Sequence, residues 1–195
     1  GIHRFFLAKG SHVLYEEKHV GVGTGLGIRS IDPVTEIYLE EGASLEMDSL
    51  QLGGVDTTVR KTSAVVGKDA HLIIRERILT EKEQEAQTDF VVEMNGENSS
   101  VNLVSRSVAR DNSHQAYRSK IVGNAPCAGH SECDAIIMDH ASVIASPALT
   151  ANSVDASLIH EAAIGKIAGE QLIKLMTLGL TEKEAEDQIV NGFLK

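Results

Sequence analysis

The chain has 195 residues, of which 42% are hydrophobic, and its 18 basic and 28 acidic residues give a formal net charge of −10. A chain of this length buries one sizeable core, so we expect a single globular domain with an appendage. The acidic balance repels phosphate, and no apolar run approaches the roughly 20 residues of a membrane span, so we expect no nucleic-acid partner, no membrane insertion and a cytoplasmic location.

Residues 1–33 show little regular patterning and form the first segment of the chain. Glycines alternate at positions 21, 23, 25 and 27, but they do not fit the G-x-G-x-x-G spacing and no helical pattern follows. We therefore exclude a dinucleotide-binding loop and predict a flexible or tightly turning segment here. Because the chain begins with Gly rather than Met, we expect native N-terminal sequence to be missing.

Residues 34–166 carry a loose repeat in which strand-like runs alternate with glycine-led polar turns. The turn glycines at positions 42, 67, 96 and 123 are spaced by 25, 29 and 27 residues. The chain also has no Trp and only 4% aromatic residues, which suits narrow, repetitive packing. These features favour a mainly β fold with a parallel β-helix core. A meander or sandwich would give similar strands without needing the near-constant period.

Residues 167–195 change to a helical period. Gly179 ends the first apolar stripe as a glycine C-cap does, and Thr181 with Glu184 matches a capping box that begins a second helix. We predict a helical hairpin. Such a pair either caps an open end of the solenoid or presents an apolar face to a partner, and the sequence leaves both uses open.

Cys133 and His160 are candidate metal ligands because their separation along the chain matches the repeat interval. Residues one coil apart stack at about 4.8 Å in a solenoid, so the thiol and the imidazole could share one face. Glu161 adds a carboxylate, but strand alternation points it to the opposite side. Cys127 and Cys133 are expected to be free thiols, and we interpret His130 as a solvated or hydrogen-bonded residue.

The last third of the chain resembles the SufB/SufD family of iron–sulfur cluster assembly proteins. The resemblance covers about residues 123–195, and it is closer to SufB in the cysteine and the His–Glu–Ala step. The matching motifs are Glu132–Cys133–Asp134, His160–Glu161–Ala162, Gly165–Lys166–Ile167, Glu170–Gln171–Leu172, Gly179–Leu180–Thr181–Glu182–Lys183–Glu184–Ala185 and Ile189–Val190–Asn191–Gly192–Phe193.

The resemblance implies a right-handed parallel β-helix followed by a C-terminal helical region. It implies an iron–sulfur cluster or iron as a transient, labile cargo, with Cys133, His160 and Glu161 as ligands. It also implies dimerisation through the β-helix, as a homodimer or with a SufB/SufD paralogue. In a homodimer, Cys133 of one subunit would face His160 of the other. A SufC-type ABC ATPase would dock on the helices, where we assign Leu180, Glu184 and Ala185 as partner-binding residues.

We therefore expect a non-enzymatic scaffold of iron–sulfur cluster assembly. One alternative is a structural adaptor that recruits the ATPase and binds no metal. Another is a β-helix enzyme acting on carbohydrate. The enzyme is disfavoured because the sequence has no clustered basic and acidic pair on one strand face and no six-residue repeat.

Overall fold

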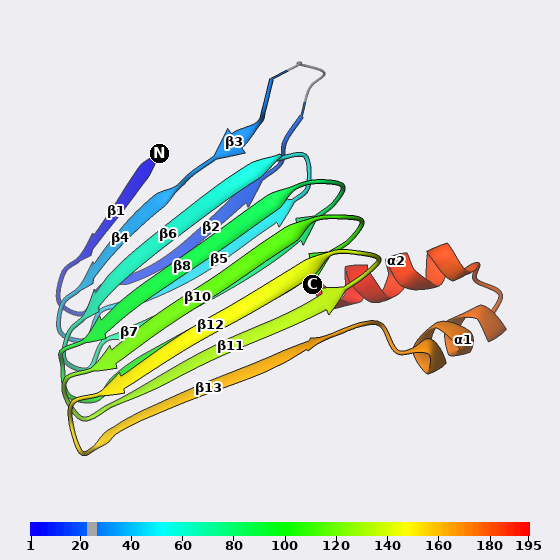
Figure 1. Cartoon of the computed structure of the whole chain (residues 1–195). Helices are drawn as coiled ribbons and strands as arrows, with labels where there is room; N and C mark the ends of the chain where they lie inside the picture. The colour runs from blue at the N-terminus through cyan, green and yellow to red at the C-terminus, as the bar shows by residue number, and fades with distance from the viewer. Residues whose placement is uncertain (23–26) are drawn as a thin grey trace.

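The computed structural model describes residues 1–22 and 27–195, and its strands wind into a parallel β-helix (Figure 1). Glycines 23 and 25 of the predicted turning segment lie outside the described residues. The described strands and helices are β1 (Ile2–Leu7), β2 (His12–His19), β3 (Ser30–Ile31), β4 (Val34–Leu39), β5 (Ser44–Leu52), β6 (Thr57–Val66), β7 (His71–Thr80), β8 (Glu85–Met94), β9 (Ser99–Ala109), β10 (His114–Gly123), β11 (Cys127–Ile137), β12 (Ser142–Ala151), β13 (Ala156–Gly165), α1 (Gly169–Thr177) and α2 (Glu182–Phe193).

Successive strands alternate between two sheets, so two strands make one coil. Sheet A has the order β1-β4-β6-β8-β10-β12, with β3 also beside β6, and sheet B has the order β13-β11-β9-β7-β5-β2. Every pairing between neighbouring strands is parallel. The predicted mainly β fold with a parallel β-helix and two C-terminal helices is confirmed.

The length of one coil varies along the solenoid. Val34 pairs with Ile2 of the coil before it and with Lys61 of the coil after it, so the first coil is longer than the second. The glycine spacing predicted the period only approximately because it mixes two turn positions. Gly42 is followed one coil later by Asp69 rather than by Gly67, and Gly42 and Asp69 both adopt a positive φ, at 67° and 53°.

The β-helix begins earlier than residue 34, because β1 and β2 form its first coil from residues that we predicted to be poorly patterned. These strands stand at the end of the solenoid, where only part of each inward face is covered. A terminal strand therefore tolerates weaker alternation of apolar and polar residues. The last strand ends at Gly165, next to the predicted boundary at 166.

Inward-facing side chains of both sheets form the core. They are mostly aliphatic, because the two sheets lie close together and leave little room for rings. The largest fully buried apolar side chains include Ile37, Leu45, Leu72, Met94, Leu103 and Ile121. Each inward position repeats in the next coil, so the core is one continuous column.

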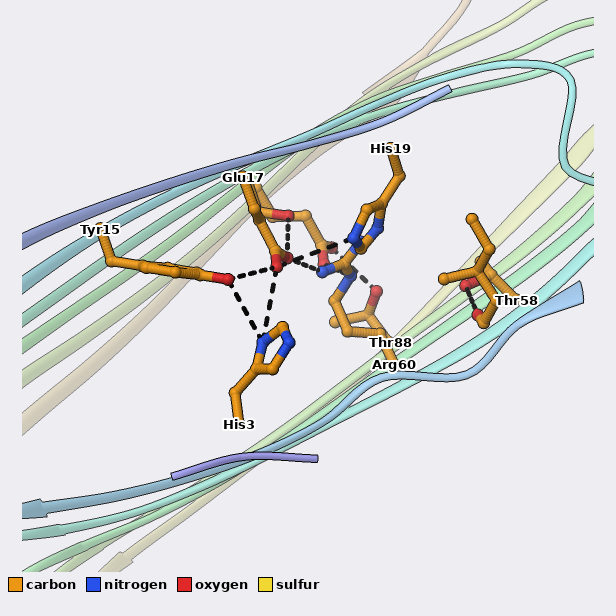
Figure 2. A network of polar contacts seen from close by, with 10 residues as sticks. His3, Tyr15, Glu17, His19, Thr58, Arg60 and Thr88 are labelled. Atoms are coloured by element: carbon orange, nitrogen blue, oxygen red, sulfur yellow. Dashed lines mark hydrogen bonds and ion pairs between the residues drawn. The ribbon is translucent and has the colours of Figure 1, made fainter. Parts of the chain in front are cut away.

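A network of charged side chains interrupts this column near the first coils (Figure 2). Arg60 lies between two carboxylates: it forms a close ion pair with Glu17, and its Nε is 3.1 Å from Oε2 of Glu76. Thr88 donates a hydrogen bond to Glu76 at 2.8 Å, and His19 lies 3.7 Å from Glu17. All three charged groups of the Glu17–Arg60–Glu76 cluster are buried.

Burial and pairing act in opposite directions on these carboxyl groups. Burial pushes the pKa of Glu17 upward, but Arg60 and His19 outweigh it and hold that pKa below its ordinary value. Burial raises the pKa of Glu76 although Arg60 opposes the shift. The network is therefore a set of buried charges that depend on one another for compensation.

The two helices differ in how they meet the β-helix. Val190 of α2 and its C-cap residue Leu194 are buried against side chains near the ends of sheet B strands, such as Val108 and Leu79. Ala185 of α2 is also buried. The predicted capping box is present, with Thr181 and Glu184 bonded reciprocally. Helix α1 has no buried residue within the described structure. Neither described helix combines the length and apolar character that crossing a membrane requires.

Candidate metal centre

The candidate site lies in the last two strands of sheet B, β11 and β13. Their register pairs Ser131 with His160 and Cys133 with Ala162. The coil is therefore longer here than the separation of Cys133 and His160 along the chain, so Cys133 is two positions along from Ser131, the residue that faces His160. A shift of two positions preserves the side of the strand. Strand spacing and rise place the Cα atoms of Cys133 and His160 about 8 Å apart.

Cys133 lies on the inward face and is only 1% exposed. Burial, with smaller contributions from the nearby Asp134 and Glu76 charges, raises the pKa of its thiol to about 12. Cys127, at the start of the same strand, is also buried, and burial raises the pKa of its thiol as well. Both cysteines are free. A thiolate would therefore form at Cys133 only when a metal or a change in the surroundings displaces its proton.

His160 points to the same inward face from the terminal strand β13. Its Nδ1 is buried and finds no hydrogen-bond partner among the described residues. The facing residue, Ser131, is already engaged, because its hydroxyl lies 3.0 Å from the hydroxyls of both Tyr117 and Ser119. An unpaired buried ring nitrogen costs free energy, which makes Nδ1 of His160 a candidate ligand atom. Four other buried side-chain atoms, on Gln51, Arg60, Glu76 and Arg77, also lack a hydrogen-bond partner among the described residues.

Glu161 lies on the outward face, where β13 pairs it with Glu132. Its carboxylate and the side chains of His130 and Glu132 bring one ligand atom each within 4.8 Å of one another. The three ligands predicted from the sequence are therefore divided between two faces of sheet B. Cys133 and His160 point inward, whereas Glu161 points outward, as strand alternation predicts.

Two residues of this outward cluster, His130 and Glu132, were not identified from the sequence as candidate metal ligands. His130 was interpreted as a hydrogen-bonded residue, and its Nδ1 does lie 3.0 Å from Oδ1 of Asn102, but its Nε2 also lies 3.5 Å from Glu161. His130 and Glu132 alternate on one strand face, which is the signal that could have found them. Recognising it requires the register that brings Glu161 opposite Glu132.

Two of the three residues assigned to partner binding, Glu184 and Ala185, have structural roles in the hairpin. Ala185, a residue of α2, is fully buried. The carboxylate of Glu184 accepts hydrogen bonds from the backbone N–H and the hydroxyl of Thr181. Those hydrogen bonds lower the pKa of the Glu184 carboxyl. The large exposed apolar side chains lie instead around α1, with Ile173 62% and Leu178 76% exposed.

The C-terminal end of the β-helix presents two open sheet edges. β12 and β13 each pair with one strand only within the described part of the chain. Exposed apolar side chains accompany these edges, including Ile144, Leu149 and Ile164. Unpaired edges with apolar neighbours are surfaces on which another chain can add strands.

Comparison with known proteins gives one consistent result. Residues 8–193 match the family model described as "SUF system FeS cluster assembly, SufBD core domain". The curated protein "Iron-sulfur cluster assembly SufBD family protein MJ0034" of Methanocaldococcus jannaschii is 34% identical over 166 residues, which cover 84% of this chain and 52% of that protein.

Two further archaeal relatives carry the same family description. The protein of Archaeoglobus fulgidus is 33% identical over 197 residues, covering all of this chain and 52% of its own length. That of Methanothermobacter thermautotrophicus is 30% identical over 203 residues, covering all of this chain and 47% of its own length. The chain thus spans about half the length of these curated relatives.

Proposed function

Because the chain belongs to the SufBD family of iron–sulfur cluster assembly proteins, we propose that it is a scaffold that holds iron or a nascent iron–sulfur cluster as cargo and is not itself an enzyme. The observation that carries this proposal is the unpartnered Nδ1 of His160 on the inward face shared with Cys133, among the described residues. We place its work in the cytoplasm.

The donor set suits the cargo. Thiolate sulfur and imidazole nitrogen both bind iron. The thiol of Cys133 stays protonated until the metal arrives, because burial raises its pKa to about 12, so binding must release a proton. Because part of the binding free energy is used to deprotonate the Cys133 thiol, the site holds its cargo less tightly. Weak binding suits a cluster that has to be transferred to another protein.

A second subunit would complete the ligand set. The open edges of β12 and β13, with exposed Ile144 and Leu149 beside them, support pairing of two β-helices end to end. In a homodimer, the expected approach of Cys133 of one subunit to His160 of the other would require the last coil to open, because Cys133 is 1% exposed and lies one strand in from the β13 edge. A SufB/SufD paralogue could take the place of the second copy. Edge pairing would also cover the apolar side chains of both ends.

The helical hairpin is the surface that we propose for a SufC-type ABC ATPase. Leu180, Glu184 and Ala185 remain predictions from the family resemblance. Exposure supports α1 as the contacting element, since Ile173 and Met176 are exposed apolar residues on it. Ile173→Glu should abolish co-purification with such an ATPase and leave folding intact. Undiminished binding by that variant would argue against this face.

Anaerobic reconstitution with iron and sulfide tests the scaffold. Cys133→Ala should lose most of the visible cluster absorbance and bound sulfide, because the sulfur ligand is gone. The matched control is Cys127→Ala, which removes the other buried thiol of β11 and should keep the wild-type yield. Equal cluster content in wild type and Cys133→Ala would contradict the assignment of Cys133.

The burial of Cys133 also favours one competing function, a structural adaptor that recruits the ATPase without binding metal. A thiol that is 1% exposed can serve simply as a small apolar core residue. Metal analysis of anaerobically purified protein separates the two functions. The scaffold carries iron that depends on Cys133, whereas the adaptor carries none.

A further inference from the structure

We propose that the outward face of sheet B holds a divalent-cation site of its own, formed by His130, Glu132 and Glu161. This site is separate from the inward pair Cys133 and His160, since alternate residues of β11 and β13 point to opposite sides of the sheet. In this proposal Glu161 binds the ion together with His130 and Glu132 rather than with Cys133 and His160.

The geometry of the three side chains supports this assignment. Each offers a ligand atom, and these atoms lie within 4.8 Å of one another. Nε2 of His130 is 3.5 Å from Oε2 of Glu161, a separation that two ligand atoms can keep while both bind one ion at about 2.1 Å. Two neighbouring strands supply the ligands, so the backbone holds them in a fixed arrangement.

A hydrogen bond from a residue of the neighbouring coil orients the imidazole ring of His130. Nδ1 of His130 lies 3.0 Å from Oδ1 of Asn102, the residue that faces it on β9. An amide oxygen only accepts hydrogen bonds, so Nδ1 carries the proton and donates it. Nε2 is then left with its lone pair directed toward the carboxylates. Metal-binding histidines are commonly oriented in this way by a second hydrogen bond.

The charges of the surroundings also favour a cation. Asp134 occupies the next outward position of β11 after Glu132, so a further carboxylate adds negative charge beside the cluster. The nearest basic group in the described structure is Arg106, whose guanidinium is 4.0 Å from Glu132. That distance is too long for a hydrogen bond, so Arg106 compensates the acidic side chains only in part. A bound cation would relieve the remaining repulsion.

The chemistry of the donors indicates the class of ion. One imidazole nitrogen and two carboxylate oxygens suit divalent first-row metals such as Fe²⁺, Mn²⁺ or Zn²⁺ rather than soft Cu⁺. The side chain of Glu161 is 67% exposed, so water can fill the remaining coordination positions. The identity of the ion as Fe²⁺, stored across the sheet from Cys133, rests on the proposed function, whereas the site itself does not.

Anaerobic titration with Co²⁺ alone, followed by its visible absorption, tests the site, with Fe²⁺ alone measured by equilibrium dialysis. His130→Ala and Glu161→Gln should each weaken binding at least tenfold. Arg106→Gln should strengthen it, because a competing positive charge is removed. The matched control is His140→Ala, which removes a histidine from the turn after β11 and should leave the affinity unchanged.

Cys133→Ser separates this inference from the proposed function. The outward site predicts wild-type Co²⁺ affinity at this site in Cys133→Ser and no sulfur-to-metal charge-transfer band in that variant. Loss of Co²⁺ binding in Cys133→Ser, wild-type affinity in both His130→Ala and Glu161→Gln, or no binding to the wild-type chain would each overturn it. If cluster reconstitution is indifferent to Cys133 while this titration behaves as expected, only the scaffold function fails.

Discussion

The two ends of the β-helix interior place polar side chains on equivalent inward positions but treat them in opposite ways. Near the first coils, Arg60 lies beside Glu17 (Figure 2) and forms ion pairs with both Glu17 and Glu76. Each buried charge therefore has a partner of opposite sign, although Nε of Arg60 and Oε2 of Glu76 make no hydrogen bond among the described residues. Near the last coils, Cys133 stays neutral and His160 keeps a buried nitrogen without a partner within the described residues.

This difference separates polar groups that hold the fold from polar groups that are available for binding. A buried charge that has a partner of opposite sign cannot take up a ligand without breaking that ion pair. An unpaired buried donor costs the fold some stability and gains it back only when something binds. A polar side chain in the interior therefore does not indicate a binding function by itself. Whether that side chain already has a partner is the better guide to function.

The largest expected effect on stability follows from removing the positive charge of Arg60. Arg60→Met should lower the free energy of unfolding by about 3–5 kcal/mol, because two buried carboxylates lose their partner. Urea unfolding measures it. Arg118→Met is the matched control, since Arg118 pairs with Asp89 at 3.4 Å on the surface and should cost under about 1 kcal/mol. Similar small losses in both variants would remove the contrast.

The second effect concerns the reactivity of the neutral thiol at the other end. With a pKa of about 12, Cys133 has about a thousandfold less thiolate at pH 8 than an ordinary cysteine, so its alkylation by iodoacetamide should be slower by that factor. Because the folded pKa is raised, the rate should grow about tenfold per pH unit toward pH 12. Mass spectrometry of the labelled peptide follows it in native and urea-unfolded protein.

An alkylation rate in the native protein equal to that in urea would show that Cys133 is accessible as a thiolate. The raised pKa also has a consequence for stability. The protonated thiol favours the folded state fully below the ordinary cysteine pKa, and this contribution is lost as the pH rises toward 12. Cys133→Ala should therefore flatten the alkaline loss of stability.

The smallest effect is expected at the unpaired ring. His160→Leu should change the free energy of unfolding by no more than about 1 kcal/mol, and it should be neutral or stabilising, because no hydrogen bond of Nδ1 is lost. Ser131→Ala, at the facing position, removes hydrogen bonds to Tyr117 and Ser119 and should cost about 1–2 kcal/mol. A loss in His160→Leu greater than that in Ser131→Ala would mean that His160 is structural.

Local features were predictable because they depend on short-range chemistry. The strands of the repeat follow from alternation of apolar and polar residues, and the capping box of Thr181 and Glu184 needs only a short, fixed spacing. The coil length was less predictable. A turn accepts Gly42 or Asp69 in the same conformation, so glycines alone mark the period only approximately.

The candidate site shows where such an error matters. A shift of two positions along a strand leaves the face unchanged, so the inward orientation shared by Cys133 and His160 survives the correction. The shift does change which residues meet, and the outward cluster of His130, Glu132 and Glu161 depends on the true register. The burial of Val190 on α2 likewise depends on where the helix packs against sheet B.

The sequence by itself determined the strand repeat, the helical hairpin, the resemblance to the SufB/SufD family and the types of side chain that can bind iron, because periodicity and residue chemistry are written along the chain. Only the tertiary structure decided the register between β11 and β13, and with it the meeting of His130, Glu132 and Glu161 on the outward face. Register is set by the summed length of strands and turns in each coil, and no single residue reports that sum.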